Sequence, residues 1–135
     1  MKTFKILFTI FAIFLLNAQV SAKGKYKWPE KDAFHEVMSH TFHPAEEGDF
    51  APIRSRIDEM VTKAIAFKNS EIPSYFENKA KIKKSLKKLV KQTKAFSKKV
   101  KSGASDADLK ADFEALHDVF HEVVGLCSAE DEHNH

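Results

Sequence analysis

Hydrophobic residues recur every three or four positions in four stretches of the chain, a spacing that predicts four amphipathic α-helices. No stretch alternates convincingly between apolar and polar residues as a β-strand would. The inner positions of the first two stretches are Phe34, Met38, Thr41 and Phe42, followed by Ile53, Ile57, Met60, Ala64 and Phe67. Those of the last two are Ile82, Leu86, Leu89, Thr93, Phe96 and Val100, followed by Leu109, Phe113, Leu116, Phe120, Val123 and Cys127.

Proline, glycine and capping residues separate these stretches. The predicted start signals are Pro29, Asp49, the capping box Ser74-x-x-Glu77, and Ser105-x-x-Asp108. The predicted ends lie near Glu47, Asn69 and Gly103, with a break or kink expected at Pro44. Four helices joined by short links pack most simply as an antiparallel, up-down-up-down four-helix bundle, so we expect an all-α fold.

The first 22 residues have the three parts of a secretory signal peptide. Lys2 and Lys5 make a basic start, residues 6–16 form an almost unbroken apolar run, and Val20-Ser21-Ala22 matches a small-x-small cleavage site. The run is too short for a retained membrane helix. We therefore expect a periplasmic protein made of a signal peptide over 1–22, a bundle domain over 23–127 and a flexible acidic, histidine-containing tail over 128–135.

Charge is unevenly distributed along a chain whose formal net charge is +3. Residues 79–101 hold eleven lysines and no acid, whereas Glu130, Asp131 and Glu132 make the tail acidic. We interpret the lysines as the solvated outer face of a helix, which could also dock an acidic protein. Aromatic residues are almost absent among them, so no nucleic-acid partner is expected. No membrane contact is expected after signal cleavage either.

Cys127 is the only cysteine, which excludes an internal disulfide framework. In an oxidising compartment such a thiol is buried, bound to a metal, or paired with another chain. The last alternative would make the protein a homodimer.

Five of the seven histidines fall in the first and fourth predicted helices. They are His35, His40 and His43 in the first helix, and His117 and His121 in the fourth. In an antiparallel bundle these two helices lie side by side, so His35 falls at the height of His121 and His40 near His117. His117 and His121 are four residues apart and share one helix face, as two ligands of one ion do in several zinc sites.

The histidines predict a site for a transition metal, because imidazole and sulfur ligands suit zinc, copper or haem iron. Its expected inner ligands are His35, His117 and His121, with Met38 and Cys127 as soft partners. A second, outer cluster would contain Glu36, His40, His43 and Glu47. Three carboxylates spaced to orient the imidazoles as outer-shell partners are Asp32, Glu114 and Asp118.

Several catalytic classes find no support in the residues. No serine lies in a nucleophile elbow, and Cys127 lacks a convincing histidine with an orienting partner. A ferritin-like di-iron centre needs glutamates from the other helices, yet residues 79–101 offer only lysine. The chain also has only four glycines and no glycine-rich phosphate loop. We therefore expect no enzyme activity and no catalytic residues.

Phe120-His121 and the run Val124-Gly125-x-Cys127 resemble parts of the periplasmic cytochrome b562 and cytochrome c′ group of four-helix bundles. The resemblance implies a non-covalent haem b held by His121 and by Met38 or His35. The chain departs from the c′ type because C-x-x-C-H is absent: Cys127 is followed by Ser128-Ala129-Glu130.

Three functional hypotheses follow from the sequence. The first is a periplasmic protein that sequesters or carries zinc or copper, with the tail as a loose collecting arm. The second is a b-type cytochrome that carries single electrons, and the third is an interaction protein without a cofactor. The first is favoured because the clustered histidines, together with His133 and His135, exceed what haem needs.

Overall fold

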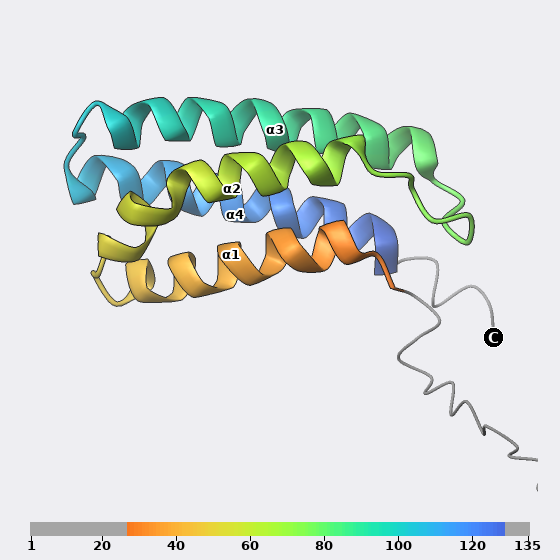
Figure 1. Ribbon diagram of the computed structural model, residues 1–135, viewed down its shortest axis with the longest axis horizontal. Coiled ribbons are helices and arrows are strands. Elements are labelled where there is room, and N and C mark those ends of the chain that lie inside the picture. The colour runs from red at the N-terminus through yellow and green to blue at the C-terminus, as the bar shows by residue number, and fades with distance from the viewer. Residues whose placement is uncertain (1–26, 129–135) are drawn as a thin grey trace, which may run out of the picture.

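The computed structural model describes residues 27–128, so the predicted signal peptide and residues 129–135 of the predicted tail lie outside the described residues. The described chain forms four α-helices and no strand (Figure 1). They are α1 (Pro29–Glu46), α2 (Ala51–Asn69), α3 (Lys79–Lys101) and α4 (Asp106–Ser128). The prediction of an all-α four-helix bundle is confirmed.

Consecutive helices pack side by side, and α1 packs against α4 to close the bundle. The start of α1 meets the end of α2, where the rings of Trp28 and Phe67 lie 4.9 Å apart between centroids. The end of α1 meets the start of α4, where Phe42 and Phe113 lie 5.1 Å apart. The chain thus runs along α1, back along α2, and alternates again through α3 and α4, as the colours of Figure 1 show. α1 and α3 occupy opposite corners of the bundle.

The core consists of the inner stripes that the sequence predicts. Every residue assigned to an inner position of the four helices is buried. Two of these residues are polar, Thr41 and Thr93, and each hydroxyl donates a 2.7 Å hydrogen bond to the carbonyl oxygen four residues earlier. The apolar core therefore includes both threonines without leaving an unpaired hydroxyl, which would cost about 1–3 kcal/mol.

Most of the predicted helix ends are confirmed. Gly48 and Gly103 follow α1 and α3 with φ of +90° and +78°, the left-handed conformation in which glycine carries no steric penalty. The Asp49 carboxylate accepts a 3.0 Å hydrogen bond from the backbone N–H of Ala51 at the start of α2. At the start of α4, the Ser105 hydroxyl accepts one of 3.2 Å from the N–H of Asp108.

Two local predictions are wrong. α3 does not begin at the capping box around Ser74 but at Lys79, because the link folds back onto the start of α1. There the Phe76 ring packs 5.9 Å from that of Trp28, and the Tyr75 hydroxyl donates a 3.1 Å hydrogen bond to the carbonyl of Lys27. Of the break or kink expected at Pro44, the break is absent, since α1 continues through this residue to Glu46.

Across residues 27–128, none of the four helices combines the length and the apolar character needed to cross a membrane.

Candidate functional site

His117 and His121 form a pair on the exposed side of α4. Their spacing of four residues places them one turn apart on the same helix face. The two Nε2 atoms are 3.1 Å apart, and the ring centroids are 4.3 Å apart with the planes nearly perpendicular. In this arrangement one ring donates an N–H to the unprotonated nitrogen of the other.

The surroundings of His117 favour its neutral form. Its ring stacks on that of Phe42 from α1, with centroids 3.8 Å and planes 11° apart. Burial lowers the pKa of His117 below its ordinary value, and the charge of His121 adds to this effect, while Glu46 and Asp118 act against it. A neutral imidazole is the form that binds a metal ion.

Three polar residues of α1 lie along the seam with α4. His35 stacks on Phe120, with centroids 5.5 Å apart and planes 23° apart, which places it beside the turn that carries His121. Near the other end of α1, the Nδ1 atom of His43 lies 3.0 Å from a carboxylate oxygen of Glu46. The charges of His43 and Glu46 both act on His117. Along this seam, His117 and His121 of α4 therefore lie between His35 on one side and the His43–Glu46 pair on the other.

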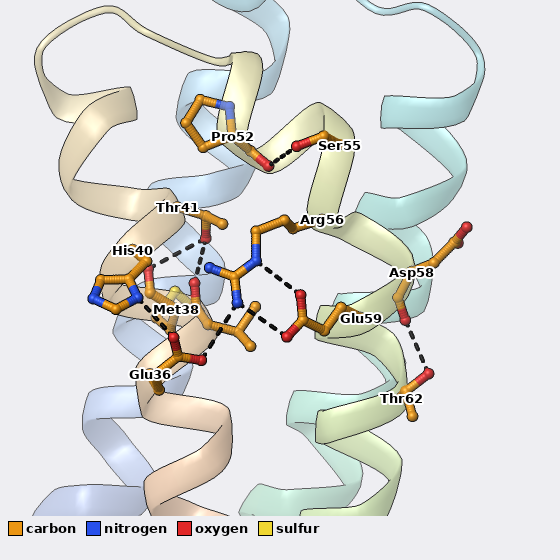
Figure 2. A network of polar contacts seen from close by, with 11 residues as sticks. Glu36, Met38, His40, Thr41, Pro52, Ser55, Arg56, Asp58, Glu59 and Thr62 are labelled. Atoms are coloured by element: carbon orange, nitrogen blue, oxygen red, sulfur yellow. Dashed lines mark hydrogen bonds and ion pairs between the residues drawn. The ribbon is translucent and has the colours of Figure 1, made fainter.

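His40 lies apart from this seam, on the side of α1 that faces α2. Its Nδ1 atom is 2.7 Å from a carboxylate oxygen of Glu36, and Arg56 of α2 reaches the other oxygen of Glu36 at 3.4 Å. Figure 2 shows this network continuing to Glu59, whose pKa the hydrogen bond from Arg56 lowers. The predicted outer cluster of Glu36, His40, His43 and Glu47 is thus divided: His40 pairs with Glu36, whereas His43 pairs with the unpredicted Glu46 and Glu47 caps the end of α1. His40 does not accompany His117.

The two sulfur residues predicted as soft partners, Met38 and Cys127, are buried rather than exposed beside the histidines. Met38 is 1% exposed and packs within the core. Cys127 is buried in the last turn of α4, about 9 Å along the helix axis from His121 at 1.5 Å per residue. Within residues 27–128, no three or more His, Cys, Asp or Glu side chains are grouped closely enough to hold a metal ion. Among the described residues, the structure therefore brings together His117 and His121, and it separates Met38, His40 and Cys127 from them.

The three predicted orienting carboxylates have different surroundings. Asp118 acts on His117 through its charge. Glu114 borders a small hollow between α1 and α4, together with Phe42 and Glu46. Asp32 is exposed and lies 3.6 Å from the ammonium group of Lys31.

Two features of this site were not predicted from the sequence. One is the presence of Glu46, and the other is the stacking of the Phe42 ring, predicted only as a core residue, on His117. Both residues lie on the helix flank that carries His35, since Phe42 is seven residues and Glu46 eleven residues beyond it, which corresponds to two and three turns. Tracing that flank forward from His35 would have found them.

No family model, curated protein or solved structure matches this chain. It is an all-α protein with a four-helix bundle and a paired histidine site.

Proposed function

We propose that this protein binds a transition-metal ion, zinc or copper, through His117 and His121, and that it sequesters or carries the ion in the periplasm. The observation that carries the proposal is the 3.1 Å separation of the two Nε2 atoms on an exposed helix face. Export to the periplasm rests on the signal-peptide pattern of residues 1–22.

The separation of the two nitrogens suits two ligands of one ion. Zinc-bound imidazole nitrogens lie about 2.0–2.1 Å from the metal, so two of them at a tetrahedral angle are about 3.3 Å apart. At the right angle of a square-planar copper site, the same bond length gives about 2.9 Å. The observed 3.1 Å lies between these values.

Two histidines leave further coordination positions to be filled. The charges of Glu46, Asp118 and His43 all act on His117. A carboxylate or imidazole among them that moved to the ion would add an oxygen or nitrogen ligand suited to zinc or copper. His133 and His135 follow α4 by only a few residues, and five extended residues span up to about 17 Å. We propose that this arm captures ions and delivers them to the pair.

The test uses the chain from Lys23 onward, purified without an affinity tag. Its bound metals are quantified and its affinities for Zn²⁺ and Cu²⁺ are measured by competition with a chelating dye. About one equivalent of metal is expected, and this binding should be lost in the His117→Ala/His121→Ala double variant. The matched control is His40→Ala, which removes an exposed histidine paired with Glu36 and should bind as the unchanged chain does.

Two results would overturn the proposal. One is equal metal binding by the double variant and the unchanged chain, and the other is a haem Soret band with no zinc or copper. The role of the arm is tested separately with His133→Ala/His135→Ala, which should slow metal capture without changing the number of ions bound.

A further inference from the structure

The eleven lysines of α3 fall into two groups according to their neighbours. Three form ion pairs across the bundle: Lys88 with Glu122 at 2.9 Å, Lys99 with Asp112, and Lys101 with Asp58. The other eight are exposed, and none of them has an ion-pair partner within residues 27–128. Within the described part of the chain, ion pairs thus neutralise only three of the eleven lysine charges.

Five of the eight form a continuous line, here named the lysine row, which consists of Lys83, Lys87, Lys91, Lys94 and Lys98. Steps of four, four, three and four residues keep these side chains on one helix face. That face points away from the bundle, since the opposite face of α3 supplies its buried stripe. At 1.5 Å per residue the row is about 22 Å long.

This charge pattern opposes the stability of α3. Like charges three or four residues apart destabilise a helix by about 0.2–0.5 kcal/mol per pair, and the row contains four such steps. The first turn of α3 has no acid and carries Lys79 and Lys81, although a helix N-terminus favours negative charge. Glutamate at alternate positions would have kept the face polar without these costs. A solvated outer surface therefore does not require eleven lysines.

We propose that the lysine row docks the bundle onto an anionic phospholipid surface. Clusters of four to eight lysines on one helix face bind anionic headgroups, and each lysine near the surface contributes independently. The outer face of α3 has no arginine, tryptophan or tyrosine, the residues that anchor protein partners. It also has no exposed aromatic ring to stack a base, because Phe96 is buried.

Docking through α3 would leave the histidine site accessible. α1 lies at the corner of the bundle opposite α3, and the site lies along the seam of α1 with α4 (Figure 1). A bundle lying on α3 therefore presents α1 to the solvent. The inference does not rest on metal binding, and each proposal can fail without the other.

The inference differs from the expectation, drawn from the sequence, that the chain contacts no membrane after signal cleavage. That expectation rested on the absence of a long apolar run, and such a run identifies only segments that cross the membrane. A row of ammonium groups needs no apolar segment, because it binds at the headgroups without entering the hydrocarbon region.

The test is sedimentation of the chain from Lys23 with vesicles of phosphatidylcholine alone or with 30% phosphatidylglycerol. Binding is expected only to the anionic vesicles and should fall steeply with added salt. The triple variant Lys87→Gln/Lys91→Gln/Lys98→Gln should bind about a hundredfold more weakly, at roughly fivefold for each lysine. The matched control, Lys31→Gln/Lys63→Gln/Lys110→Gln, removes the same charge from the other three helices and should change binding by less than about threefold.

Three outcomes would overturn the inference. They are equal binding to neutral and anionic vesicles, equal losses in the two triple variants, and binding to double-stranded DNA or an acidic protein in preference to anionic vesicles. Circular dichroism and urea denaturation check that both variants fold. The row variant should be at least as stable as the unchanged chain because it relieves like-charge repulsion.

Discussion

The imidazole of His117 in α4 lies flat against the phenyl ring of Phe42 in α1, with 3.8 Å between centroids and 11° between planes. Phe42 itself is 5% exposed and rests edge-on against Phe113. A core residue therefore sets the position of one histidine of the candidate metal site. The same contact withdraws one face of the imidazole from water, and burial is the main cause of the lowered pKa of His117.

The first prediction concerns this pKa. In an NMR titration of the unchanged chain, His117 should titrate below the ordinary histidine value of about 6.5. Phe42→Leu keeps an apolar side chain in the core but removes the flat ring, so it should raise the pKa of His117 toward 6.5. A pKa that stays the same or falls in this variant would show that the stack does not cause the shift.

The second prediction follows from the sign of the shift. Because the folded pKa is lowered, the unfolded chain binds more protons than the folded chain between the folded pKa and about 6.5. The free energy of unfolding should therefore decrease as the pH falls through about 6.5, and this contribution should level off below the folded pKa. Urea denaturation at several pH values should show a smaller decrease for His117→Gln. Identical pH profiles for the two chains would contradict it.

The third prediction separates a shared ion from two independent sites. If His117 and His121 hold one ion, either single alanine variant should weaken binding by at least about tenfold. The double variant should then lose much less than the sum of the two single losses, because both variants remove the same ion. Calorimetric titration with Zn²⁺ and Cu²⁺ measures the three affinities, and additive losses would indicate separate sites.

The fourth prediction concerns Arg54 at the start of α2. Its guanidinium donates 2.7 Å hydrogen bonds to the carbonyl of Ala104 in the link and to the carboxylate of Asp106, the first residue of α4, so it joins α2 to the start of α4. Arg54→Ala should lower the free energy of unfolding by about 1.5 kcal/mol. Asp106→Asn should cost less than about 0.5 kcal/mol, because the ion pair is solvent-exposed. If urea denaturation shows the same decrease in the free energy of unfolding for both variants, the ion pair with Asp106 provides the stability, and the hydrogen bond to Ala104 does not.

The fifth prediction uses two glycines with opposite backbone conformations. Gly125 lies in α4 with a negative φ, and a Cβ atom added there would meet nothing within 4 Å. Gly125→Ala should therefore raise the free energy of unfolding by about 0.5–1 kcal/mol. Gly103 also has open space around it, but its φ is +78°, so Gly103→Ala should destabilise the chain. Thermal denaturation of both variants checks the contrast.

The fold was largely predictable because apolar periodicity reports directly on burial. The stripe from Ile82 to Val100 is entirely buried, and Gly103 ends α3 as expected. The start of α3 was not predictable, because a local capping pattern at Ser74 competes with a tertiary contact. Phe76 gains a buried position against Trp28, and the chain around it stays non-helical to reach that position.

The candidate site was predictable within one helix but not between helices. Spacing along α4 was enough to bring His117 and His121 together. The residues that face them from α1 depend on the rotation of that helix, which is fixed by contacts such as Phe34 with Phe120, at 5.2 Å between centroids. The sequence therefore placed His40 near His117, whereas the packing directs His40 toward α2 and places Glu46 near His117 instead.

The first and last helices of the bundle, α1 and α4, lie next to each other. Their backbones come close at fewer positions than those of any two consecutive helices. Partial unfolding should therefore begin with α1 swinging away from α4, at a free energy well below that of global denaturation. An ion bound by residues of both helices would hold α1 against α4 and oppose this opening. Amide hydrogen exchange in α1 would then slow when Zn²⁺ or Cu²⁺ is added.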